Sequence, residues 1–222
     1  MRKQNFFLMA IIFLFAFSIN NAQLSNWGVK AALNNSTFSG DGLDNIESKW
    51  GYGIGVYVNF PMNEQFSIQP ELYYNNKGAT YSESDTESGF DYTLTLSADF
   101  TIPMNYLEIP ILGVYSVNPN FSIFAGPYFD IFLSGKAEYE SDYHYADDYG
   151  NTEDGSSSGS EEIDSEDMTI PGYGIVAGAE YNFGKFNVGA RYSLGLNNIG
   201  DSSDEEIKHQ NIQFTVGFQI NN

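Results

Sequence analysis

Apolar and polar residues alternate along most of the chain, and this period of two limits the fold more than any other feature. In the segment WGYGIGVYVNF (50–60) every second residue is apolar, and FNVGARYSLGLN (186–197) and NIQFTVGFQI (211–220) repeat the pattern. Such alternation is typical of β-strands whose two faces meet different surroundings. Eight strands are expected in all, because similar patterns cover about 24–38, 66–78, 105–117, 121–136 and 170–183.

Two features of these segments favour a closed transmembrane barrel over a soluble β-sandwich, which would also alternate. The polar positions are mostly Gly, Ser, Asn, Gln and Tyr, which suit a narrow enclosed interior. The connections also alternate in length, as they do between the periplasmic turns and the extracellular loops of such barrels. The short ones are 61–65, 118–120 and 184–185, and the long ones are about 39–49, 79–104, 137–169 and 198–207.

Closure also follows from the solvent, because in lipid every backbone N–H and C=O group needs a partner and a barrel has no free edge. We therefore predict an all-β fold, an eight-stranded antiparallel up-and-down transmembrane β-barrel. Residues 91–102 alternate as well and are expected to extend the fourth strand above the membrane, with Pro103 marking a break or bulge.

The first 22 residues have the layout of a secretory signal peptide. Arg2 and Lys3 precede an apolar core from Phe6 to Phe17, and the small residue Ala22 precedes Gln23. A membrane anchor is the alternative, but the apolar core is shorter than the ~20 residues that span a bilayer. We expect a signal peptide over 1–22 and one barrel domain over 23–222. The expected location is the cell outer membrane, with both termini periplasmic.

The net charge and the absence of cysteine limit the kinds of partner and of stabilising site that we expect. The whole chain has a net charge of −20, and loss of Arg2 and Lys3 with the signal peptide makes it −22. This charge argues against nucleic acid as a partner. Because the chain contains no cysteine, neither a disulfide nor a thiolate metal site is expected.

Most acidic residues fall in the expected extracellular loops. The segment 137–168 alone carries 12 of them and no Lys or Arg. Such a composition buries too little apolar surface to order itself, so we expect a mobile, solvated acidic loop. Two sharper hypotheses remain open for these loops: weak divalent-cation binding through DDYGNTED (147–154), whose spacing differs from the helix–loop–helix calcium motif, and a protein contact through interleaved tyrosines.

The run YLEIPILGVY (106–115) places a glutamate and a proline inside an apolar segment. In a barrel, Leu107, Ile109 and Ile111 face lipid, so Glu108 and Pro110 face the polar lumen. The same parity directs every ionisable residue expected in mid-strand inward. This predicted lumenal charge network consists of Lys30, Glu71, Lys77, Glu108, Asp130, Glu180 and Arg191.

Turn lengths predict which of these side chains meet. A two-residue turn at 184–185 places Phe183 opposite Phe186 and Gly178 opposite Arg191, with Arg191 diagonal to Glu180.

The turn at 118–120 places Glu108 directly opposite Asp130. Since like charges opposite one another are destabilising, we predict that Lys77 or Arg191 lies between them or that one carboxyl is protonated. The interior of an eight-stranded barrel is just wide enough for side chains to fill. A structural plug of ion pairs is therefore expected rather than a proton or ion relay.

Three runs carry a family resemblance. YLEIPILGVY, SIQPELYYNNKG (67–78) and FSIFAGPYFDIFLSGK (121–136) together resemble the PorT-like outer-membrane β-barrel family, which is related in architecture to the small OmpA-type and OmpX-type barrels. The resemblance covers essentially the whole mature chain. It implies one further role, because the namesake of the family is linked to the type IX secretion pathway: an accessory subunit of a larger outer-membrane machine.

The sequence offers little for catalysis. Its two histidines are His144, in the acidic loop, and His209, which lies near Ser202 and Ser203 without a recognisable motif. We therefore expect a non-enzymatic protein with no catalytic residue, cofactor or metal centre.

The expected function is surface interaction or envelope structure, with membrane lipid around the barrel and a protein partner at the extracellular loops or the barrel wall. The alternatives are an accessory subunit of a secretion or assembly machine and, third, a small-solute or ion channel.

Overall fold

The computed structural model describes residues 26–40, 46–166, 168–200 and 206–220, so the expected signal peptide lies outside the described residues. Among the described residues, no helix is both long and apolar enough to cross a bilayer. The strands are β1 (Asn26–Ser39), β2 (Ile46–Pro61), β3 (Phe66–Ser88), β4 (Tyr92–Asn118), β5 (Phe121–Asp147), β6 (Thr152–Glu162), β7 (Gly172–Phe183), β8 (Phe186–Gly195) and β9 (Lys208–Gln219).

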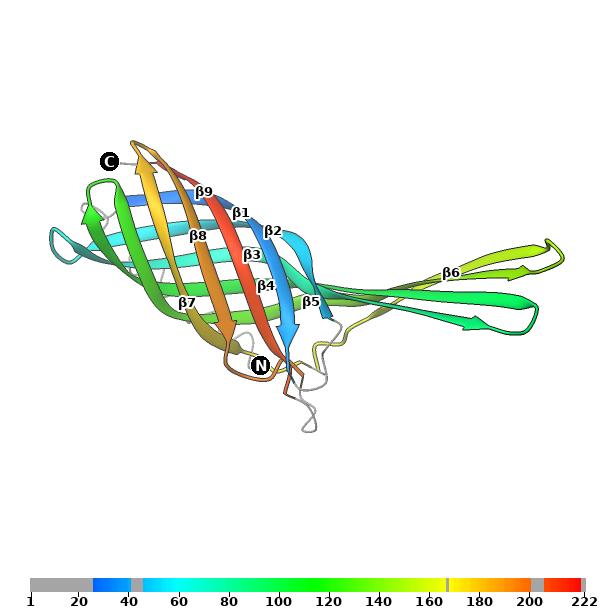
Figure 1. Ribbon diagram of the computed structural model, residues 1–222. Coiled ribbons are helices and arrows are strands. Elements are labelled where there is room, and N and C mark those ends of the chain that lie inside the picture. Colours follow the sequence, from blue (N-terminus) through cyan, green and yellow to red (C-terminus); the bar gives the residue numbers. More distant parts are fainter. Residues whose placement is uncertain (1–25, 41–45, 167, 201–205, 221–222) are drawn as a thin grey trace.

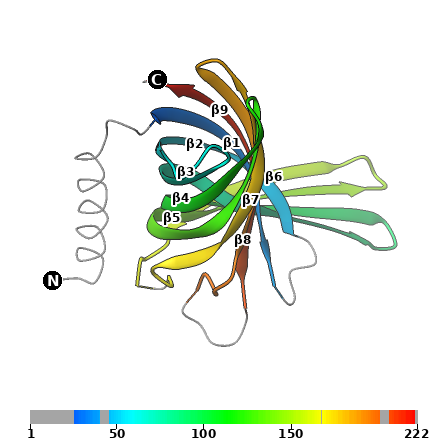
Figure 2. The same ribbon diagram turned by 90° about the vertical axis from the view of Figure 1, so that its left-hand side faces the viewer.

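Eight of these strands form one closed antiparallel barrel (Figures 1 and 2). The order runs from β4 through β3, β2, β1, β9, β8 and β7 to β5, and pairing of β4 with β5 completes the ring. The remaining strand, β6, is not part of the ring and pairs with the outer part of β5. The predicted eight-stranded antiparallel barrel is thus confirmed.

The short connections gather at one end of the barrel. They are 62–65, 119–120 and 184–185, and the described chain begins and ends at the same end, where Gly28 lies opposite Gln219. The two-residue turn at 184–185 gives the predicted register, with Phe183 opposite Phe186. Gly184 has a φ of +67°, the left-handed conformation that such a turn needs.

Three strands run far past the barrel at the opposite end. β3 has 23 residues, and β4 and β5 have 27 each, whereas about 9–11 suffice to cross a bilayer. Their outer parts and β6 form a four-stranded antiparallel sheet, here called the fin (residues 79–101 and 136–162), which projects to the right in Figure 1. The predicted extension of the fourth strand over 91–102 is part of this sheet.

The fin differs from two expectations. The connection expected over 79–104 is almost entirely strand, and in the acidic segment 137–168 residues 137–146 pair with 152–161, although the composition predicted little order. The physical reason is that the long edge of β5 supplies backbone partners, so a Ser- and Gly-rich strand can add to it without a core of its own.

The break or bulge expected at Pro103 is not found there. β4 runs unbroken through Pro103, which pairs with Gly78. The register shifts instead on β5, where Leu133 is the extra residue between the pairs Asn105–Ser134 and Tyr106–Phe132. This bulge reverses the parity of β5 between the barrel and the fin.

The two faces of each barrel strand are those that the alternation predicts. On β2, Trp50, Tyr52, Ile54 and Val56 point outward and are 40–64% exposed, which gives the barrel an apolar outer surface. Between them, inward glycines make room for aromatic rings. A Cβ atom built on Gly55 would lie 2.7 Å from the ring of Tyr73.

Replacement of Gly55 by Val therefore tests the interior packing. We expect the barrel's free energy of unfolding to fall by about 1–3 kcal/mol, the usual cost of overpacking a core. The measurement is the urea midpoint of heat-modifiable gel mobility. Ala31→Val, which adds bulk on the outward face of β1, is the matched control and should leave the midpoint unchanged. Equal midpoints for both variants would contradict this packing.

Candidate functional site

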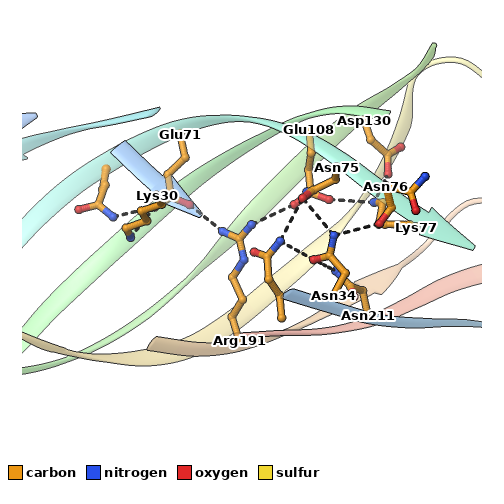
Figure 3. Close-up of polar contacts among 12 residues, drawn as sticks. Lys30, Asn34, Glu71, Asn75, Asn76, Lys77, Glu108, Asp130, Arg191 and Asn211 are labelled. Atoms are coloured by element: carbon orange, nitrogen blue, oxygen red, sulfur yellow. Dashed lines mark hydrogen bonds and ion pairs between the residues drawn. The ribbon is translucent and has the colours of Figure 1, made fainter. Parts of the chain in front are cut away.

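The lumen holds a dense set of charged side chains. The seven residues predicted there lie on β1, β3, β4, β5, β7 and β8, and their side chains are 0–13% exposed. Figure 3 shows six of them along the inside of the barrel. Strands that are far apart in sequence thus bring their ionisable groups to one axis.

Lys77 is the cation between the two opposed carboxylates. Glu108 and Asp130 face one another across β4 and β5, as the turn length predicted. The Lys77 Nζ atom donates to Glu108 Oε2 at 2.8 Å and to Asp130 Oδ2 at 3.1 Å. The ammonium group therefore relieves the like-charge repulsion that the register creates.

Arg191 and Lys30 continue this chain of ion pairs. Arg191 donates to Glu71 Oε2 at 2.6 Å and to Glu108 Oε1 at 3.3 Å, while Lys30 Nζ lies 2.9 Å from Glu71 Oε1 and 2.7 Å from Glu180 Oε2. Arg191 thus turns away from its diagonal neighbour Glu180. The result is one alternating series, in the order Glu180, Lys30, Glu71, Arg191, Glu108, Lys77 and Asp130.

Each cation of the series also lies over an aromatic ring. Lys30 Nζ is 4.8 Å from the ring centre of Tyr57, and Arg191 Cζ is 4.5 Å from that of Tyr73. Lys77 Nζ is 4.9 Å from the ring centre of Tyr106. These distances are those of cation–π contacts, which add attraction in a desolvated interior.

A layer of amides packs beside the charges, and sequence reasoning missed its role. Gln213 Nε2 donates to Asn34 Oδ1 at 2.7 Å and to Asn75 Oδ1 at 3.1 Å, and Asn34 Nδ2 lies 3.3 Å from Asn75 Oδ1. All three side chains are buried. The available signal was parity, since each amide has the inward position of its strand.

An apolar cluster covers the lumen at the fin end. Met104, Tyr106 and Phe132 are its buried centre. Partly buried residues pack against them: Phe38, Ile102, Ile163, Met168 and Ile170. Tyr106 and Met168 of the cluster, together with Tyr128 and Asp130, help to line a cavity of about 20 Å³, which has room for about one water molecule.

His209 packs against this cluster, a buried position that no motif in the sequence indicated. It is 6% exposed, and its Nε2 atom lies 2.9 Å from the Tyr106 hydroxyl. Its ring centre is 5.2 Å from that of Phe38. Ser202 and Ser203, its expected neighbours, lie outside the described residues.

His144 is likewise placed differently from the expectation of an unordered loop. It lies on β5 in the fin, where its Nδ1 atom is 2.5 Å from Asp154 Oδ1 on β6. Both side chains are more than half exposed. The pair is therefore a solvated imidazole–carboxylate contact on a sheet surface.

The acidic tip of the second fin hairpin is occupied by turn hydrogen bonds. The Asn151 side chain donates to Asp147 Oδ2, and the backbone N–H groups of Asn151 and Tyr149 donate to Asp147 Oδ1. These bonds, the one from the Asn151 side chain first, hold the pKa of Asp147 below its usual value. Among the described residues, no group of three or more His, Asp or Glu side chains is placed to hold a metal ion. Weak divalent-cation binding stays a prediction, which calorimetry with calcium chloride on purified protein tests.

A family model decides the identity of the barrel. The model of the outer membrane protein beta-barrel domain matches residues 21–201, most of the chain. The chain belongs to this outer-membrane β-barrel family. The family places the protein in the outer membrane, with lipid around the apolar outer surface described above.

The chain is similar to several solved structures at low sequence identity. Ail, the attachment invasion locus protein of Yersinia pestis, is 12% identical with a TM-score of 0.43, over 88% of this chain and 99% of that chain. Neisserial surface protein A is 10% identical with a TM-score of 0.37, over 87% and 97%. CarO of Acinetobacter baumannii is 11% identical with a TM-score of 0.35, over 86% and 96%. A search of curated proteins gave no match.

Proposed function

We propose that this protein is a non-enzymatic outer-membrane anchor with a closed lumen, which presents the fin at the cell surface for contacts with other molecules. The observation that carries the proposal is the filling of the barrel. The alternating ion pairs run along the lumen, and the apolar cluster covers its fin end. A filled lumen favours an anchor over a small-solute or ion channel.

The orientation follows from the two ends of the barrel. Outer-membrane barrels have short turns toward the periplasm and long connections outside the cell. In this orientation the turns 62–65, 119–120 and 184–185 and both termini are periplasmic, and the fin is extracellular.

The lumenal network has a structural role in this proposal. Every one of its carboxylates has a cationic partner within 3.3 Å, and the cations come from three different strands. A buried charge that keeps its partners is stable, whereas one that loses them is costly. The network therefore ties the strands of the wall to one another through the lumen.

The role of the fin is tested by purification from native membranes. A tagged full-length protein and a variant in which tight turns replace residues 82–99 and 139–159 are extracted in mild detergent. We expect a protein partner to be recovered with the full-length chain and lost with the trimmed variant. Recovery of a stoichiometric partner by both would instead identify an accessory subunit that binds through the barrel wall. Recovery of neither would contradict a surface-contact role.

A further inference from the structure

The fin has two chemically different faces. Cross-strand pairing aligns Tyr81, Phe100 and Tyr139 in one row and Asp85, Leu96 and Tyr143 in another. Because side chains on a strand alternate between faces, these rows lie on the same side of the sheet. This side, the aromatic face, carries Tyr81, Tyr92, Leu94, Leu96, Ala98, Phe100, Tyr139, Tyr143 and Tyr145.

The opposite side, the hydroxyl face, is polar: it carries Ser and Thr residues of β3 and β4 and acidic residues such as Asp99 and Glu140. Hydroxyl pairs span it, with Ser84 Oγ 3.4 Å from Ser97 Oγ and Thr86 Oγ1 3.3 Å from Thr95 Oγ1. A sheet that is solvated on both sides has no reason to separate its residues in this way. The separation therefore indicates that the aromatic face meets something other than water.

The aromatic face is open and hollowed. Leu96, Phe100, Tyr139 and Tyr143 are 38–51% exposed. Leu96 and Tyr143 also line a groove of about 650 Å³, where small residues lie beside them: Ala98, Ser141, Gly155 and Ser157. Exposed apolar surface of this kind on a regular sheet marks an interaction site.

Carboxylates line one side of this apolar strip. Glu83, Asp85 and Glu87 are successive residues of β3 on the aromatic face, and Glu83 and Asp85 border the groove. Alternate residues on a strand are about 6.8 Å apart, so the three charges form an evenly spaced row. Lys136 is the one Lys or Arg in the fin sequence, and it pairs with Glu138 at the base.

The aromatic face is on the same side of the strands as the lumen-facing side chains of the barrel. On β3, Tyr73 and Lys77 point into the lumen, and Tyr81 and Glu83 keep the same parity. By parity, the face therefore continues the inner wall of the barrel, not its lipid-facing outer wall. Figure 1 shows β4 and β5 running on from the barrel into the fin. A second copy of this chain, with its net charge of −20, would be repelled by the acidic row.

We propose that the aromatic face binds a cationic amphipathic segment of a partner protein. Its apolar side chains fill the groove, and its Lys or Arg side chains pair with Glu83, Asp85 and Glu87. Electrostatic complementarity of this kind fixes the register and favours this class of partner over acidic ones. The inference rests on the proposed surface role of the fin and adds the face, the groove and the chemistry of the partner.

Synthetic peptides test this chemistry directly. The probes are an 18-residue amphipathic Leu/Lys peptide and its Leu/Glu counterpart, and the target is the full mature protein in zwitterionic nanodiscs. Fluorescence anisotropy measures binding, and empty nanodiscs give the lipid background. We expect saturable binding of the Leu/Lys peptide above background and at least tenfold weaker binding of the Leu/Glu peptide.

Two matched triple variants separate the face from the overall charge. Glu83→Gln, Asp85→Asn and Glu87→Gln together are expected to weaken the Leu/Lys peptide about tenfold, because three ion pairs are lost. The control Asp99→Asn, Glu140→Gln and Glu162→Gln removes the same charge from hydroxyl-face residues that do not line the groove, and it should change binding less than twofold. Likewise Leu94→Ser with Leu96→Ser should abolish binding, and Thr93→Ser with Thr95→Ser should not.

Equal weakening by both triple variants would overturn the proposal, since it would show only general attraction to an acidic protein. Binding no stronger than to empty nanodiscs would overturn it as well. Either result leaves the purification from native membranes unaffected. Loss of the partner on fin trimming, combined with no effect of the aromatic-face variants, would retain the surface role and reject this face as its site.

Discussion

Replacement of Arg191 by Met is expected to lower the barrel's free energy of unfolding by about 3–5 kcal/mol, the usual cost of breaking a buried ion pair. Arg191 donates to Glu71 at 2.6 Å and to Glu108 at 3.3 Å, and both carboxylates are completely buried. The methionine fills much of the volume but supplies no charge. Each carboxylate then depends on a single lysine, and the β8 side of the lumen loses its tie to β3 and β4.

Urea unfolding of the purified barrel, followed by heat-modifiable gel mobility, measures this effect. Lys185→Met is the control, because it removes the same charge from an exposed two-residue turn. We expect the Lys185 variant to match the wild type and the Arg191 variant to unfold at a clearly lower urea concentration. Unchanged mobility and midpoint for Arg191→Met would show that the pairing adds nothing to stability.

The second large effect is expected for Lys77→Met, also about 3–5 kcal/mol. Lys77 Nζ lies within 3.1 Å of both Glu108 and Asp130, which face one another across β4 and β5. Without it Glu108 keeps Arg191, but Asp130 loses the cation that offsets the neighbouring carboxylate. The opposed pair then repels across the strand boundary.

A double-mutant cycle with Asp130→Asn measures the interaction free energy between Lys77 and Asp130. Adding Asp130→Asn to Lys77→Met removes the stranded charge, so we expect the double variant to be more stable than Lys77→Met alone, with a coupling of about 0.5–3 kcal/mol. The urea midpoints of the four proteins give the coupling. Strict additivity would mean that Asp130 does not depend on Lys77.

Much of the barrel could be predicted because its rules are local. Alternation indicated which face of β2 carries Trp50 and Ile54, and the predicted three-residue turn at 118–120 was sufficient to place Glu108 opposite Asp130. In the structure Asn118 pairs with Phe121, and a register shift between Ser116 and Asn118 keeps the predicted pairing. The alternation along β8 also predicted that the Arg191 side chain faces inward, and this prediction did not require knowing that the sheet closes into a ring. The partner that Arg191 selects required the closed ring, because β3 and β8 approach one another only across the lumen.

The fin was harder to predict because its signals are not local. The stretch TEDGSSSGSEE (152–162) has no apolar alternation and, apart from Thr152, no residue of high strand propensity. It is a strand because the edge of β5 pairs with it. The extra residue Leu133 reverses the parity of β5. Asp130 in the lumen and Tyr139 on the aromatic face therefore lie on the same side of the strand, although an even- and an odd-numbered residue of a regular strand would lie on opposite sides. A bulge of this kind has no distinct sequence signature here.

The central claim is that buried ion pairs and the apolar cluster close the lumen, and conductance of the protein in planar lipid bilayers tests it most directly. Insertion is first established by the heat-modifiable band of the same reconstituted sample. The filled barrel predicts no current above that of protein-free lipid. Stepwise conductance from the inserted wild-type protein would contradict a closed lumen.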